Sequence, residues 1–156
     1  MNAKNDLLLA FISYVRAAYH WFHAAHHCTS GTGFIGDHDL YSEIYEDFLS
    51  ILDGIIEKSI GMCGYEGAAA PLVSLELAIK ILQEYPSPEG LTSLAIATTA
   101  LQLDKDFLSV VDELFVTLEE AGELPLGLND FLAATANKHE TFIYKLTQRV
   151  KSEVQN

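Results

Sequence analysis

The chain has 156 residues, of which 49% are apolar and 20% charged, a composition that predicts one globular domain rather than a disordered chain. Its 22 Asp and Glu against 9 Lys and Arg give a formal charge of −13, which disfavours binding to nucleic acid or to an anionic membrane. The apolar runs are short and interrupted, so no membrane span is expected, and the apolar N-terminal patch is interpreted as the start of a helix.

Apolar residues recur at helical spacing along most of the sequence. In chain order, this periodicity predicts four long helices over about 5–28, 37–60, 88–121 and 128–153, and a short helix is possible at 71–83. The predicted fold class is therefore all-α: a ferritin-like four-helix bundle with a long, partly helical connection between helices two and three. We expect a single ferritin-like domain over 1–156.

Several residues define the expected ends of these helices. Asp37 is an N-cap candidate for the second helix, and Gly61 and Gly64 are its expected stops. The third helix is expected to start near Ser87 or Glu89, with Pro88 in its first turn. The predicted inner face of the last helix consists of five residues: Leu128, Phe131, Ala134, Phe142 and Leu146.

Four residues form a candidate set of metal ligands: His26, His38, Asp53 and Glu57. Two imidazoles and two carboxylates suit a hard or borderline divalent metal such as iron, manganese or zinc. Asp53 and Glu57 lie one turn apart on one helix face, whereas His38 lies about 22 Å from Asp53 along the helix axis. One metal cannot therefore be bound by His38 and Asp53 of the same copy.

The four ligands can meet if two copies of the second helix pack antiparallel about a two-fold axis. His38 of one subunit then faces Asp53 and Glu57 of the other, and His26 reaches the same place through the short glycine-containing turn. The spacing alone leaves an alternative open, in which the two carboxylates are solvated surface groups and the two histidines are a helix-end pair without metal.

The stretch from His26 to His38, with Gly31 and Phe34 between them, and the following Asp53-x-x-x-Glu57 resemble the signature of the Dps family of mini-ferritins. The pattern aligns without a gap from His26 to Glu57, and the last helix is also similar. The resemblance implies a hollow dodecamer built from two-fold dimers, with His26 and His38 from one subunit and Asp53 and Glu57 from its mate. It also implies oxidation of Fe(II), typically by hydrogen peroxide, and storage of the ferric mineral.

The sequence departs from the family pattern at three places. Ser42 stands where an acidic residue often follows the second His, which leaves open whether each site holds one iron or two. His27 stands in place of the usual Trp, although Trp21 lies on the same helix. A basic tail of the kind that some members use to hold DNA is not expected, since the chain starts MNAKND and ends KSEVQN.

The remaining histidines have weaker interpretations. His20, His23 and His27 share one face of the first helix and form either an accessory metal or entry site or, more often in such stripes, a packing face. His27 is also a possible substitute for the missing acid. His139 is expected to be packed or capped. No Glu-x-x-His sequence occurs, which argues against a di-iron centre inside one bundle.

The sequence thus predicts an iron-oxidising, iron-storing mini-ferritin of the cytoplasm that protects against oxidative stress. The first rival is a non-catalytic ferritin-like shell with a degenerate site, and the second, weaker rival is a DNA-binding Dps. Cys28 and Cys63 match no zinc or redox spacing and are expected to be reduced, partly buried thiols.

Overall fold

The computed structural model describes residues 3–65 and 70–154, and these residues form five helices and no strand. The helices are α1 (Ala3–Cys28), α2 (Phe34–Cys63), α3 (Pro71–Leu82), α4 (Ser93–Glu120) and α5 (Leu126–Val154). The predicted all-α class and the helical segment in the long connection are confirmed. The single domain over 1–156 stays a prediction, and residues 1–2, 66–69 and 155–156 lie outside the described ranges.

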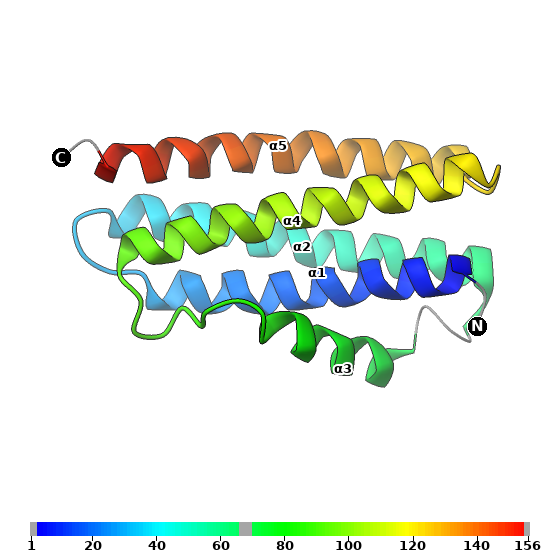
Figure 1. The fold of residues 1–156 in the computed structure, drawn as a ribbon, viewed down its shortest axis with the longest axis horizontal. Helices are drawn as coiled ribbons and strands as arrows, with labels where there is room; N and C mark the ends of the chain where they lie inside the picture. The colour runs from blue at the N-terminus through cyan, green and yellow to red at the C-terminus, as the bar shows by residue number, and fades with distance from the viewer. Residues whose placement is uncertain (1–2, 66–69, 155–156) are drawn as a thin grey trace.

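The four long helices lie side by side, and α3 covers the outer side of α1 (Figure 1). The long connection returns the chain to the end of the bundle where α2 began, so that α2 and α4 run in the same direction. One such long crossover is what distinguishes a ferritin-like bundle from a simple up-and-down bundle. The core between the helices is rich in aromatic rings, and the Phe107 ring packs between those of Phe11 and Phe48, with centroids 5.6 and 4.8 Å away.

The second helix begins earlier than predicted, because Gly33 rather than Asp37 precedes its first residue, Phe34. Asp37 lies inside the first turn and is 2% exposed. Its two carboxylate oxygens accept hydrogen bonds from Nε and Nη2 of Arg149 on α5, at 2.6 and 2.9 Å. The N-cap prediction for Asp37 was therefore wrong, since this carboxylate joins α2 to α5. Gly64 caps the helix as expected, whereas Gly61 lies within it.

The fourth helix begins later than predicted. Pro88 is buried in the connection and lies outside the helix, which starts at Ser93. The Thr92 hydroxyl accepts a hydrogen bond from the backbone N–H of Ala95 at 3.1 Å, the usual way in which a threonine satisfies the first turn. A start at 87–89 was wrong because a proline permits but does not require a helix start, and Thr92 provides a true cap.

The inner face of α5 is more polar than predicted. Leu128, Phe142 and Leu146 are buried, but Ala134 is exposed, and Thr135 and His139 occupy the inner positions. The Ala134 prediction was wrong because a stripe of apolar residues alone missed these two polar positions. His139 is fully buried, as expected for a packed histidine.

Two further features bear on the predictions made from the sequence. Cys28 and Cys63 are free, half-buried thiols, as predicted. None of the helices in the described part of the chain combines the length and the apolar character that a membrane crossing requires.

Candidate metal centre

His26 and His38 lie in direct contact at the junction of α1 and α2. Their rings are stacked, with centroids 3.6 Å apart and planes inclined by 24°. The turn that brings them together contains Gly31, whose φ of +84° lies in the left-handed region that favours glycine. The Gly31 carbonyl accepts a hydrogen bond from the N–H of Phe34 at 3.1 Å, which starts α2 directly after the turn. The predicted proximity of the two histidines is confirmed.

A reciprocal pair of hydrogen bonds fixes both imidazoles. Nδ1 of His26 lies 2.8 Å from the His38 carbonyl oxygen, and Nδ1 of His38 lies 3.0 Å from the His26 carbonyl oxygen. A carbonyl oxygen can only accept, so each Nδ1 carries the hydrogen and donates it. In the neutral ring Nε2 then carries a lone pair, and no hydrogen bond among the described residues engages it. Metal-binding histidines are commonly oriented by such a bond from the second nitrogen.

Aromatic side chains surround this pair. The Phe34 ring lies 4.9 Å from the His38 ring, and the Tyr45 ring meets the His26 ring edge-on at 5.3 Å. Tyr45 comes from α2, two turns after His38, so its ring lies along the same side of the bundle. The rings limit the rotation of both imidazoles while leaving each histidine half-exposed.

Asp53 and Glu57 lie farther along α2, and both are exposed. Because α2 is continuous from Phe34 to Cys63, Asp53 stands about 22 Å beyond His38 at about 1.5 Å per residue. In the described part of the chain, neither carboxylate has a hydrogen bond or an ion pair to another residue. No group of three or more His, Cys, Asp or Glu side chains in the described residues of one copy is arranged to hold a metal. The structure therefore brings His26 and His38 together and leaves Asp53 and Glu57 apart from them.

Ser42 is turned toward its own helix. Its hydroxyl lies 3.4 Å from Oε1 of Glu46, one turn further along α2. A serine cannot supply the carboxylate that would favour a hard cation at this position.

The structure contains a second cluster of one histidine and two carboxylates, which was not predicted from the sequence. His139 of α5 lies between Asp104 of α4, at 2.6 Å from Nδ1, and Asp47 of α2, at 3.2 Å from Nε2. Lys138 completes the group by binding Asp47. Asp47, Asp104 and His139 are far apart in sequence, and only the packing of α2, α4 and α5 brings them together.

The electrostatics of this group follow from its burial. Burial disfavours the charge of His139, but the hydrogen bond with Asp104 and the ion pair with Asp47 outweigh this effect and raise its pKa. Burial would raise the pKa of Asp47, but its bonds to His139 and Lys138 outweigh burial and lower it. The pKa of Asp104 is raised, chiefly because this carboxyl is buried. Both ring nitrogens of His139 face carboxylates, so the group binds its own members rather than presenting a free ligand.

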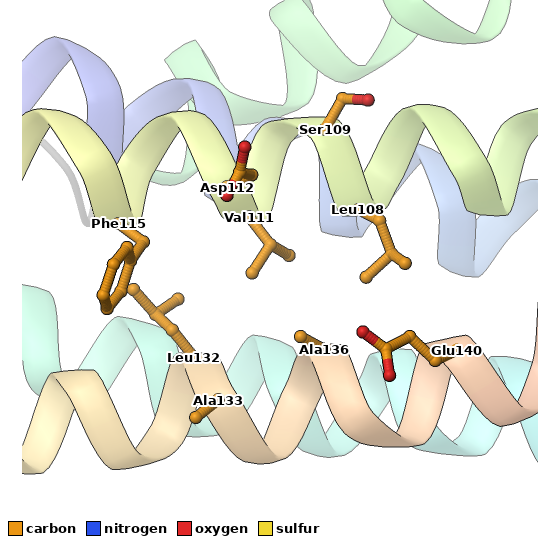
Figure 2. Close-up of a pocket in the computed structure, with 9 residues that line it drawn as sticks. All are labelled: Leu108, Ser109, Val111, Asp112, Phe115, Leu132, Ala133, Ala136 and Glu140. Atoms are coloured by element: carbon orange, nitrogen blue, oxygen red, sulfur yellow. The ribbon is translucent and has the colours of Figure 1, made fainter.

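A groove of about 380 Å³ lies between α4 and α5 (Figure 2). Leu108 and Val111 of α4 point toward α5, where Leu132 and Ala136 line the other side. None of the four predicted ligands lines it, and its lining contains neither histidine nor cysteine. The groove is therefore separate from the candidate metal centre.

Comparison with known proteins gives a clear result only at the level of structure. No protein-family model matches the chain. No curated protein matches it either. Solved structures do match. One example is CAIP of Helicobacter cinaedi, which has 22% identity and a TM-score of 0.76 and covers 94% of this chain and 99% of that one.

Two Dps structures are similarly related. Dps from Thermosynechococcus elongatus has 19% identity and a TM-score of 0.76, covering 96% of this chain and 95% of that one. A C-terminal deletion mutant of Mycobacterium smegmatis Dps has 20% identity and a TM-score of 0.75, covering 93% and 94%. The chain therefore has the ferritin-like class of four-helix bundle. Within that class its fold is that of the Dps-like mini-ferritins, which confirms the resemblance seen in the sequence at the level of the fold.

Proposed function

We propose that this protein binds and oxidises ferrous iron and stores the ferric product, and thereby protects against oxidative stress. The observation that carries the proposal is the His26–His38 pair, in which each Nδ1 is bound to a carbonyl and each Nε2 is left without a protein partner. Neutral imidazoles suit Fe(II), and carboxylates favour the ferric product. The fold shared with Dps structures supports the same conclusion.

The proposed site is shared between two copies of the chain. Asp53 and Glu57 of the partner copy would complete the ligand set, since the same residues of one copy stand about 22 Å from His38. An isologous dimer makes two such sites at once. An exposed apolar face on α3 supports association between copies, because contiguous apolar residues on a surface commonly mark an interface. Its residues are Leu72, Val73, Leu75 and Ile79. The proposed full assembly is a dodecamer built from these dimers.

The chemistry balances with peroxide as the oxidant. Two Fe(II) ions each give up one electron, the O–O bond of H₂O₂ breaks, and its two oxygens take up two protons and leave as two waters. Taking both electrons from iron consumes peroxide without releasing hydroxyl radical. The 22 acidic residues against 9 basic ones favour the approach of cations. DNA binding is not part of the proposal, because duplex binding requires Lys and Arg to neutralise phosphates. The two free thiols support a reducing, cytoplasmic location.

The main experiment is oxidation of anaerobically loaded Fe(II) by peroxide or oxygen, followed by the ferric absorbance. We expect the His38→Ala, Asp53→Ala variant to lose the fast phase. A matched control, His20→Ala with Asp112→Ala, removes one imidazole and one exposed carboxylate elsewhere and should retain it. If wild type and the His38, Asp53 variant oxidise iron at the same slow rate, the chain is a non-catalytic shell and the proposal fails.

A complementation experiment tests whether the site is shared. His38→Ala and Asp53→Ala are each expected to be inactive alone. When the two are co-assembled, half of the dimers are mixed and each of these has one intact site, so about a quarter of the wild-type activity should return. If activity does not return although mixed assemblies form, the ligands do not come from two subunits.

A further inference from the structure

Two histidines of α1 lie beside the candidate metal centre without belonging to it. His23 and His27 are four residues apart, so they occupy one helix face in successive turns. Their ring centroids are 4.9 Å apart, with the planes nearly perpendicular at 89°. His27 is exposed and His23 half-exposed, and no hydrogen bond among the described residues engages either imidazole.

This geometry suits a shared cation. Two imidazoles that bind one metal through bonds of about 2.0–2.1 Å place their centroids roughly 4.5 Å apart at a right angle and roughly 5.2 Å apart at a tetrahedral angle. The observed 4.9 Å lies between these values. A pair of histidines four residues apart on a helix is also the spacing with which helical zinc sites bind their metal.

We propose that His23 and His27 form a two-imidazole clamp for one divalent cation of the borderline class, such as Zn(II), Ni(II) or Fe(II), with water completing the coordination. Imidazole is a suitable ligand for all three. The clamp uses residues of one copy only, so it does not need the partner's carboxylates. His20 is outside the clamp, because its ring contacts Tyr19 and has no ring contact with His23 or His27.

Neighbouring rings hold the clamp in place. Tyr19 stacks on His23 at 5.8 Å, and Tyr45 meets His23 edge-on at 5.0 Å. His27 in turn meets His26 edge-on at 4.9 Å, so the clamp adjoins the His26–His38 pair. In the iron-loaded protein the clamp holds a second Fe(II) next to the first, where Ser42 provides no carboxylate. This last step rests on the proposed function, whereas the clamp itself does not.

The clamp is tested by calorimetric titration of Zn(II) into the untagged, assembled protein at moderate salt, which weakens binding to scattered exposed carboxylates. Wild type is compared with His23→Gln and His27→Gln, and His20→Gln is the matched control on the same helix. Losing one of two linked ligands should weaken this site by about 100-fold or more, because the second bond then lacks its high effective concentration. His20→Gln should bind as wild type does.

The His38→Ala, Asp53→Ala variant separates the clamp from the candidate iron centre. It should retain the site that His23→Gln loses. The proposal is overturned if His23→Gln and His27→Gln bind Zn(II) as wild type does, or if the His38, Asp53 variant loses all tight binding. His23 is the more informative of the two positions, because its ring contacts Tyr45 but not His26, whereas the His27 ring contacts His26 directly.

An iron experiment tests the consequence for oxidation. With peroxide in excess over the bound iron, His23→Gln should lower the amount of Fe(II) oxidised in the fast phase to about half, since one of two adjacent ions is lost. An unchanged amplitude would contradict the role in iron oxidation while leaving the zinc result to decide the clamp. A missing fast phase in wild type would contradict the proposed function alone.

Discussion

The protein places histidines in two regions that differ in how the ring nitrogens are used. His139, inside the bundle, has Asp104 at Nδ1 and Asp47 at Nε2, and it is fully buried. His26 and His38, at the α1–α2 junction, use only Nδ1, which donates to a carbonyl, and both are half-exposed. Histidine therefore forms a structural link in one region and a candidate ligand pair in the other.

The physical cause of this difference is access to solvent. A buried imidazole is stabilised when its nitrogens face polar partners within the protein, because an unpaired polar group inside the core is costly. A half-exposed imidazole can leave one nitrogen to water, and a metal can later replace that water. The occupancy of Nε2 is thus a better guide to function here than the presence of a nearby carboxylate.

The largest expected effect is on stability, when one histidine of each region is replaced by alanine and the two variants are compared. His139→Ala should lower the free energy of unfolding by about 3–5 kcal/mol, because it leaves Asp104 buried without its partner. His38→Ala should change it by no more than about 1 kcal/mol, as for other partly exposed positions. Urea denaturation at matched protein concentration measures both. Equal effects of the two substitutions would remove the distinction between structural and ligand histidines.

A smaller effect is expected where α2 meets α5 beside Asp53. A Cβ added at Gly54 would lie 2.7 Å from Cε2 of Phe131, closer than real contacts allow. Gly54→Ala should therefore destabilise the protein by about 1–3 kcal/mol. Gly61→Ala, in the same helix with open space around it, should stabilise it by up to about 1 kcal/mol through helix propensity. If both substitutions stabilise the protein, Phe131 does not pack closely against Gly54, and it then does not constrain the neighbouring Asp53.

The smallest effect is the pH dependence of the buried link. The pKa of His139 is raised above its ordinary value of 6.5, so its stabilisation is complete below that pH and is lost as pH rises through the raised value. The pKa of Asp47 is lowered below 3.8, so its contribution is present above that pH and is lost as pH falls through the lowered value. The link is therefore expected to be strongest in mildly acidic solution.

Unfolding midpoints measured from pH 6 to 9 check this expectation. Wild type should lose stability on the alkaline side, and His139→Gln should show a flatter profile. Lys138→Gln, which removes the exposed partner of Asp47, serves as the control and should keep the alkaline loss of stability. An equally steep alkaline loss in the His139 variant would assign the pH dependence to another group.

Local sequence signals anticipated much of the fold. Periodicity predicted four long helices and allowed a short helix at 71–83, and the glycine-containing turn correctly predicted that His26 lies beside His38. The start of α4 was missed because of a local cap, Thr92, whereas the error at Asp37 came from a partner far away in sequence. Asp37 was predicted to be an N-cap because it lies near the expected start of the second helix. In the structure its carboxylate instead binds Arg149 on the last helix. His139 could be predicted as packed, but not its two aspartates.

The sequence by itself determined the helical class, the spacing of the four candidate ligands and the distance that keeps His38 and Asp53 apart in one copy. These depend on the rise and period of a helix, which are the same in every protein. Only the tertiary structure decided which nitrogen of each histidine is free and which acids are buried partners. Those outcomes depend on contacts between residues distant in sequence, because the buried His139 and Asp37 find their partners on other helices.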